Sequence, residues 1–249
     1  MRWLGLVMLV GCRQIFGVGE PGPVERDAPA MRDAGLDGEQ DGAPPITGDQ
    51  CDPSSTGLVA CWEFDGTLLD SSGHHLDIAP TQVPFVVGHV GQAVATDNAD
   101  LNVADSHLLD VDAVTIEAWI YPAAFPMAGS RGAILDNNNQ YAMYVEANGT
   151  LRCYTGLATA DATNVLQLHI WNHVACTADG AKLHAYVNGV EVAGGVGAGI
   201  PTGSTTGLTI GSDNPSGTGS RFTGRLDAVR LYGRQLTQEE IRCAYNPNC

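Results

Sequence analysis

Most side chains of this chain that could do chemistry lie in predicted loops rather than in catalytic motifs. The stretch Asp136-Asn137-Asn138-Asn139-Gln140 is rich in amide donors and acceptors, which suit the hydroxyl groups of a sugar. Asn137, Asn138 and Asn139 are therefore candidate ligand-binding residues. The alternative is that this stretch is a solvated turn between two strands. Three further candidates of the same kind lie elsewhere: Arg131, Asn214 and Arg221.

No pattern of carboxylates or nucleophiles indicates catalysis. Glycoside hydrolysis needs two carboxylates that flank the scissile bond, and no E-x-D-x-x-E run occurs. Glu117 stands alone in IEAWIY, and the motifs G-x-S-x-G and H-E-x-x-H are absent. His173 and His184 fall in predicted strands, where a structural role is the commoner one. The sequence therefore favours a protein that is not an enzyme.

The cysteines indicate disulfides rather than a metal site. The chain has seven cysteines, and setting aside Cys12, for a reason given below, leaves an even number. No C-x-x-C and no cysteine–histidine spacing typical of zinc occurs. An even number in an exported chain predicts pairing in an oxidising compartment.

Strand positions suggest how the cysteines pair. Cys153 in TLRCYT and Cys176 in NHVACTAD can bridge if their strands are neighbours. The other four lie in two groups near the ends of the predicted domain. The simplest expectation is that they join the N-terminal strand to the C-terminal segment, as Cys61–Cys243 and Cys51–Cys249.

The first twelve residues have the order of an export leader. Arg2 supplies positive charge, and the apolar run Leu4 to Val10 is too short to span a bilayer. Leu9-Val10-Gly11-Cys12 resembles a bacterial lipobox, which implies that residues 1–11 are a signal peptide and that Cys12 becomes the lipidated N-terminus. The alternatives are an uncleaved apolar start or an ordinary secretory signal. Arg13 stands where an aspartate would retain a lipoprotein in the inner membrane, so the resemblance implies an outer-membrane lipoprotein exposed to an oxidising compartment.

Residues 12–50 form a predicted acidic tether. They are rich in proline, glycine and acidic residues, and no apolar periodicity runs through them. Such a segment cannot bury enough apolar surface to offset the entropy of ordering. We expect a disordered spacer between a lipid anchor in the membrane and a domain at 51–249.

The overall charge narrows the choice of partners. The formal net charge is −16, and Lys182 is the single lysine. Such a chain repels nucleic acid, so no nucleic-acid partner is expected. An acidic surface attracts cations such as calcium.

From residue 57 onward the sequence alternates with the period of β-strands. Val114, Ile116, Ala118 and Ile120 fall on one face of residues 113–121. Similar patterns occur at residues 140–145, 172–178, 182–187 and 224–232. Hairpin turns are predicted at Asn148-Gly149, Asp179-Gly180 and Asn188-Gly189, because these pairs accept the positive φ of type I′ turns. One short helix is predicted after Thr237, where T-x-x-E forms a capping box.

The strand segments resemble a known family when read in order. They are GLVACWEFDG from Gly57, DSSGHHLD from Asp70, AVTIEAWIYP, WNHVACTADGAKLHAYVNGVEV from Trp171, LTIGSD and FTGRLDAVRLYGRQLTQEEI from Phe222. Together they resemble laminin-G-like, concanavalin-A-like domains across residues 57–245. The resemblance implies an all-β, two-sheet antiparallel jelly-roll β-sandwich with adjacent N- and C-terminal strands and one short C-terminal helix. It also implies that Trp119, Trp171 and Tyr186 are core residues rather than a ligand platform.

The resemblance further implies a calcium site between two loops. In such domains a cation often joins the D-S-S-G loop to the aspartate of the late L-D-x-V-R strand. Carried over, Asp70 and Asp227 offer carboxylates, and Gly73 and His75 offer carbonyl oxygens, all of which suit calcium. His74-His75 stand where relatives carry Asn and Gly. The alternative is that Asp70 caps a turn and Asp227 pairs with Arg225 or Arg230.

These observations favour a non-enzymatic binding module displayed on the cell envelope. Its expected partner is a carbohydrate or a surface protein, because the rim loops of a rigid sandwich commonly carry function. Two alternatives stay open, a structural or adhesion lipoprotein of the surface and a divergent glycoside hydrolase.

Overall fold

The computed structural model describes residues 51–249 except 98, 157, 198, 215–219 and 247. The signal peptide, the lipidated Cys12 and the acidic tether predicted within residues 1–50 lie outside the described residues. In the described part, no helix has both the length and the apolar character needed to cross a membrane.

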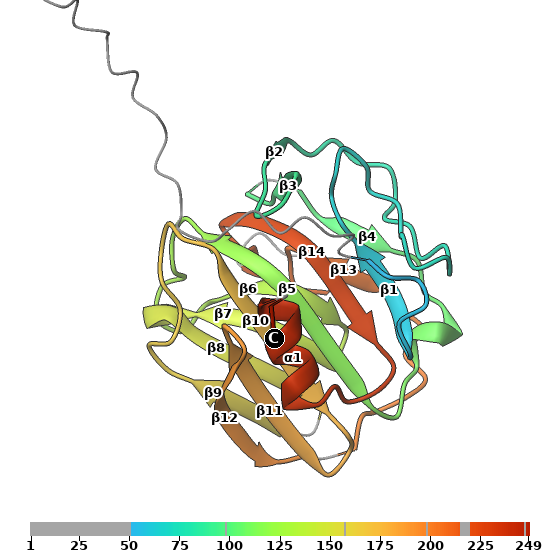
Figure 1. Ribbon diagram of the computed structural model, residues 1–249, viewed down its shortest axis with the longest axis vertical. Helices are drawn as coiled ribbons and strands as arrows, with labels where there is room; N and C mark the ends of the chain where they lie inside the picture. Colours follow the sequence, from blue (N-terminus) through green and yellow to red (C-terminus); the bar gives the residue numbers. More distant parts are fainter. Residues whose placement is uncertain (1–50, 98, 157, 198, 215–219, 247) are drawn as a thin grey trace, which may run out of the picture. The chain divides into compact units, whose positions relative to one another are not determined.

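Two antiparallel sheets pack face to face (Figure 1). The larger sheet has the order β12-β11-β10-β5-β14-β3-β2, and β1 pairs with β14 beside β3. Its strands are β1 (Leu58–Trp62), β2 (Phe85–Val87), β3 (Gln92–Ala95), β5 (Val114–Pro122), β10 (Asn172–Ala178), β11 (Lys182–Val187), β12 (Val190–Val196) and β14 (Gly224–Tyr232). The pairing of β1 with β14 places the first and last strands side by side, as predicted.

The smaller sheet has the order β4-β13-β6-β7-β8-β9. Its strands are β4 (Leu101–Val103), β6 (Arg131–Asn137), β7 (Tyr141–Glu146), β8 (Thr150–Thr155), β9 (Ala158–Ala162) and β13 (Leu208–Ile210). Short 3-10 turns occur at His107–Leu109 and Ala147–Gly149, and the helix α1 spans Gln238–Tyr245. The predicted jelly-roll sandwich with one short helix is thus the fold.

The core lies between the sheets and follows the alternation of the sequence. Val114, Ile116, Ala118 and Ile120 of β5 are all buried in one cluster with residues of the opposite sheet. Each strand therefore has a second face that points away from the core. Because that face is not needed for packing the two sheets together, it is where ligand-binding side chains can stand.

Two of the three predicted hairpin turns adopt the expected backbone. Asn148 and Gly149 have φ of 59° and 67°, and Asn188 and Gly189 have φ of 50° and 76°. The turn at Asp179-Gly180 differs, because only Gly180 has a positive φ. There the Asp179 carboxylate accepts hydrogen bonds from the amides of Ala181 and Lys182, which holds the aspartate in the ordinary region.

The helix α1 covers part of the outer face of the eight-stranded sheet. Ile241 is its buried residue and packs with Ala175, Tyr186 and Tyr232. The helix begins after Thr237, whose hydroxyl accepts the Glu240 amide while the Glu240 carboxylate accepts the Thr237 amide. The predicted capping box is therefore present.

Thr237→Ala should lower the free energy of unfolding by about 1 kcal/mol, because an amide of the first turn loses its acceptor. Urea unfolding of the full protein measures the change. Thr237→Ser keeps the hydroxyl and should keep most of the stability. Equal losses in the two variants would show that the cap itself contributes little.

The described residues form three disulfides, and one of them was predicted correctly. Cys153–Cys176 joins β8 to β10 and so ties the two sheets together. The predicted pairs Cys61–Cys243 and Cys51–Cys249 are wrong, because the bonds are Cys51–Cys61 and Cys243–Cys249. Three disulfides in the described chain indicate an oxidising, extracytoplasmic environment.

Local geometry explains the two wrong pairs. Cys61 lies between the core residues Ala60 and Trp62, so its side chain points to the outer face, where Cys51 covers it. Cys243 follows the buried Ile241 by two residues. Because a helix turns about 100° per residue, its side chain points away from the sheet and meets Cys249.

A buried ionic cluster lies on the outer face of the eight-stranded sheet. The Glu117 carboxylate of β5 accepts hydrogen bonds from Arg230 Nη1 at 2.6 Å and from His173 Nε2 at 3.2 Å. Glu117 and His173 are at most 1% exposed. Burial opposes the ionised form of Glu117, but Arg230 and His173 lower its pKa. The structural roles predicted for Glu117 and His173 agree with these contacts.

A bulge in β14 makes this cluster possible. Ala228 has a φ of 45°, and the register of β14 against β5 shifts between Asp227 and Arg230. As a result Asp227 and Arg230, three residues apart, share the outer face, while Leu226 and Val229 enter the core.

The predicted core tryptophans belong to this outer layer. Trp119 is 5% exposed and stacks on His89 with ring centroids 3.5 Å apart. Trp171 is half-buried and meets Tyr121 edge to face. Tyr186 is buried beneath α1. The prediction that these rings pack inside the protein is confirmed for Trp119 and Tyr186, although on the outer face and not between the sheets.

Candidate binding pocket on the six-stranded sheet

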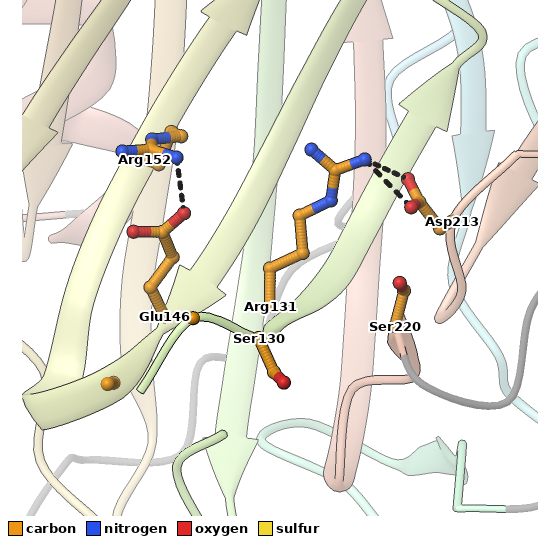
Figure 2. A pocket seen from close by; sticks show the side chains of 8 residues that line it. Ser130, Arg131, Glu146, Arg152, Asp213 and Ser220 are labelled. Atoms are coloured by element: carbon orange, nitrogen blue, oxygen red, sulfur yellow. Dashed lines mark hydrogen bonds and ion pairs between the residues drawn. The ribbon is translucent and has the colours of Figure 1, made fainter. Parts of the chain in front are cut away.

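An open pocket of about 610 Å³ lies on the outer face of the six-stranded sheet (Figure 2). It stands where β6 begins and β7 ends, beside the loop that follows β13. Its lining residues are Gly129, Ser130, Arg131, Glu146, Ala147, Arg152, Asp213 and Ser220.

The strand register brings the charged residues of this pocket together. Arg131 of β6 is opposite Glu146 of β7, and Tyr144 of β7 is opposite Arg152 of β8. Residues two apart on a strand share a face, so Tyr144 and Glu146 point the same way. The turn at Asn148-Gly149 fixes this register, because it closes β7 and β8 into a hairpin.

A bulge in β6 adds one more acidic residue to this face. The register shifts between Ala133 and Leu135, and both Ile134 and Leu135 enter the core. The outer face of β6 therefore carries Arg131, Ala133 and Asp136. Without the extra residue, Asp136 would point into the apolar core.

Arg131 is held in one position from two sides. Its Nη2 donates to both carboxylate oxygens of Asp213, at 2.9 and 2.7 Å (Figure 2). Its guanidinium carbon lies 4.3 Å from the centre of the Tyr144 ring. The side chain of Arg131 is still 40% exposed. A charge held by a chelating carboxylate and an aromatic ring is preorganised for a ligand.

Arg152 is the second fixed cation of the pocket. It donates to Asp161 through Nε and Nη2, both at 2.7 Å, and to Glu146 through Nη1 at 2.5 Å. Figure 2 shows Glu146 reaching from its strand toward Arg152. Because both arginines are paired with carboxylates, the pocket offers donors and acceptors side by side.

Asp136 lies behind the pocket in a confined environment. It is 2% exposed, and its Oδ2 accepts the Asn214 amide at 2.9 Å. Burial, together with the neighbouring Asp213, raises the pKa of Asp136 to about 7. Burial also acts to raise the pKa of Asp213, but hydrogen bonds from Asp136 and Arg131 outweigh burial, and the pKa of Asp213 is lowered. These opposite shifts of pKa favour a protonated Asp136 beside an ionised Asp213.

The predicted ligand-binding asparagines lie at the opposite end of β6. Asn137 is fully buried, and its amide donates to Gln140 at 2.5 Å. Asn138 and Asn139 form the turn with φ of 28° and 68°, and Asn138 donates to Thr206. The turn interpretation is therefore correct for the backbone. Direct ligand contact by Asn137 is wrong because its side chain is enclosed, and contact by Asn138 or Asn139 stays a prediction.

The predicted calcium ligands have separate partners. The Asp70 carboxylate accepts four hydrogen bonds, from the amides of Cys61, Ser72 and Leu76 and from the Ser72 hydroxyl. Its acceptor positions are therefore used by its own loop and by the Cys61 amide of β1. Gly73 and His75 of this loop have positive φ. This arrangement fits the turn-capping alternative better than a shared metal.

Asp227 serves a different loop. Its Oδ2 accepts the amides of His89 and Val90, at 2.8 and 3.1 Å. The alternative in which Asp227 pairs with an arginine is wrong, because Arg230 binds Glu117 and Arg225 lies over Tyr121. Burial raises the pKa of Asp227 to about 7.

In the described part of the chain, the predicted calcium ligands belong to no cluster of three metal-binding side chains. Among the described residues, the one group of three suitable side chains within reach of a single ion is Glu239, Cys243 and Cys249. Both cysteines of that group are in a disulfide. Calcium binding by Asp70, Gly73, His75 and Asp227 stays a prediction.

Sequence reasoning found one part of the pocket and missed the rest. Arg131 was a candidate and lines the pocket, whereas Asn214 binds Asp136 behind the pocket. Glu146, Arg152 and Tyr144 were missed. The hairpin signal at residues 148–149 could have found them, because it sets Glu146 and Arg152 on one face across two strands.

The sequence and fold place the chain in a known class. Residues 95–242 match the concanavalin A-like lectin/glucanases superfamily, a laminin-G-type family, and the chain belongs to it. A search of curated proteins by sequence found no match.

Similar solved structures share the fold at low sequence identity. Domain 4 of AbnA, a GH43 extracellular arabinanase from Geobacillus stearothermophilus in complex with arabinotriose, is 19% identical with a TM-score of 0.62, over 76% of this chain and 98% of that one. The binding domain of Paraclostridial Mosquitocidal Protein 1 is 17% identical with a TM-score of 0.62, over 77% and 52%. Trypanosoma rangeli sialidase with 2,3-difluorosialic acid is 20% identical with a TM-score of 0.58, over 77% and 33%. This chain thus spans about half the length of the mosquitocidal-protein binding domain and about a third of the length of the sialidase.

Proposed function

We propose that this protein is a non-enzymatic binding module for neutral carbohydrate, anchored to the bacterial envelope by a lipidated Cys12. The observation that carries the proposal is the pocket on the six-stranded sheet, in which Arg131 is immobilised by Asp213 and Tyr144 yet remains 40% exposed. A rigid donor in an open polar pocket suits a ligand that is rich in hydroxyl groups.

The mixture of charges favours a neutral sugar over an acidic one. Each sugar hydroxyl both donates and accepts, and the pocket offers guanidinium donors beside the carboxylates of Glu146 and Asp213. Within the described part of the chain, Arg131 Nη2 carries the hydrogen bonds to Asp213, which leaves Nη1 for a ligand. The net charge of −16 weakens the attraction of any anionic ligand.

The same contacts favour binding over hydrolysis. A glycoside hydrolase needs a carboxylic acid that keeps its proton and can reach the glycosidic oxygen. Asp213 and Glu146 line the pocket but are ion-paired with arginines. Asp136 can keep a proton but is 2% exposed and does not line the pocket.

The comparisons support carbohydrate as the class of ligand. The AbnA domain with arabinotriose matches along 98% of its own length, so it corresponds to the whole sandwich and not to a fragment of it. The three disulfides and the leader sequence support an exported protein. A structural or adhesion role at the surface is the second candidate, and it predicts binding to a surface protein instead of a sugar.

A glycan array tests the function, with arabinotriose as the first probe and EDTA in a parallel arm. We expect binding to neutral glycans, and Arg131→Ala should weaken it at least about tenfold, since it removes a charged hydrogen-bond donor. Arg242→Ala is the matched control, because Arg242 lies in an exposed ion pair on α1. Loss of binding with EDTA would support the calcium prediction. The absence of any glycan ligand, or equal affinity in the Arg131 variant, would refute the proposed site.

A further inference from the structure

Two acidic side chains lie close together at the back of the pocket, and one of them, Asp136, is 2% exposed. The backbone amide of Asn214, on the loop after β13, donates to Asp136 Oδ2 of β6 at 2.9 Å, and this contact brings the preceding residue, Asp213, into interaction with Asp136. Two carboxylates are both acceptors, so they can hydrogen-bond only when one is protonated. Asp136 Oδ1 is buried and accepts no hydrogen bond from a donor group among the described residues.

The other charged groups around this pair come from the neighbouring strands. Arg131 chelates Asp213 from the pocket side and also interacts electrostatically with Asp136. Tyr144 of β7 lies against Asp136, Asp213 and Arg131, and these surroundings keep its phenol protonated because burial raises its pKa. The proton on Asp136 is thus connected to the position of Arg131 through the Asp213 carboxylate, which chelates Arg131, and through the Tyr144 ring, which lies beneath it.

We propose that the Asp136–Asp213 pair is a proton-operated control of the pocket, in which the shared proton holds Asp213 in place to orient Arg131 for ligand. This inference rests on the proposed function for its ligand, but the control itself concerns only residues of this chain. When the proton leaves, two negative charges face each other in a buried site, and the chelate between Asp213 and Arg131 loses its fixed geometry.

The expected result is weaker binding as the pH rises through neutrality. Since Asp136 keeps its proton up to a pH of about 7, the competent form predominates at pH 6 and is a minor form at pH 8. The apparent dissociation constant should then rise about tenfold between these values.

The stability of the folded protein should also fall as the pH rises, in the same direction as ligand binding. Unfolding releases Asp136 to its ordinary pKa of 3.8, so the folded protein binds the extra proton between this pH and about 7. Its stability therefore falls as the pH rises through that window.

The proton control is tested without ligand by NMR of the full protein. The Asp136 carboxyl carbon and the side-chain nitrogens of Arg131 should titrate with one midpoint near pH 7. Asp136→Asn keeps a donor toward Asp213 and an acceptor for the Asn214 amide, so it imitates the protonated form. In this variant the Arg131 signals should stay constant, and glycan binding should no longer change from pH 6 to pH 8.

Asp227→Asn is the matched control, because Asp227 has a similarly raised pKa but contacts the loop at His89 instead of the pocket. It should leave the Arg131 titration unchanged. Titration of Asp136 below pH 5, or Arg131 signals that ignore it, would overturn the inference even if glycans bind. A normal Arg131 titration without any glycan ligand would instead overturn the proposed function alone.

Discussion

Replacing Glu117 with alanine should lower the free energy of unfolding by about 3–5 kcal/mol, because it strands the buried charge of Arg230. The carboxylate is 1% exposed and is the acceptor for both Arg230 and His173. Removing it leaves two donors without partners under α1, where water cannot replace the lost hydrogen bonds. Urea unfolding at neutral pH, followed by fluorescence, measures the loss.

The double variant Glu117→Leu/Arg230→Met distinguishes a stranded charge from a simple loss of packing. With both charges gone, the penalty for the unpaired arginine disappears, so the double variant should be more stable than Glu117→Ala. Arg242→Ala, which breaks an exposed ion pair on α1, should change stability by less than about 1 kcal/mol. If the double variant lost as much stability as Glu117→Leu and Arg230→Met added together, the ion pair would not explain the effect.

Removing the Cys153–Cys176 disulfide by alanine substitution at both positions should cost about 3 kcal/mol or more. The bond closes a loop with a sequence separation of 23 residues and joins β8 of one sheet to β10 of the other. In the chain-entropy description, a longer closed loop restricts the unfolded chain more. Both cysteines are also buried in the core cluster, so the change removes packed sulfur atoms.

The other disulfides provide an internal scale for this prediction. Cys243–Cys249 has a separation of only 6 residues and lies at the end of α1, so its removal should cost about 2 kcal/mol or less. Thermal unfolding of the two paired variants, with mass spectrometry to confirm the remaining bonds, gives the comparison. A larger loss from Cys243–Cys249 would show that α1 contributes more to stability than the bond between the sheets.

The strands of the large sheet were predictable because burial imposes a period of two on their sequence. Residues 113–121, 172–178 and 224–232 were placed within one residue of β5, β10 and β14. Local chemistry was equally reliable at Thr237, where the capping box has its partner three residues away. In each case the information lies in side chains that are neighbours along the chain.

The disulfides show where such reasoning stops. The adjacency of β1 and β14 was expected correctly, yet it did not decide which sulfurs meet. Cys61 pairs with Cys51 because the residue alternation of β1 turns its side chain outward, and Cys243 is turned away by the rotation of α1. A pairing between chain ends needs side-chain direction as well as strand order.

The sequence by itself determined the sandwich, most of the strands and the capped helix, and from its cysteines and its leader it predicts an exported protein. Only the tertiary structure decided that Arg131, Glu146, Arg152 and Asp213 share one pocket and that Asp136 stands behind it. The reason is physical: these residues come from three strands and a distant loop, and a bulge at Ile134 sets their common face. Backbone register and bulges depend on contacts across the whole sheet, so a local pattern does not reveal them.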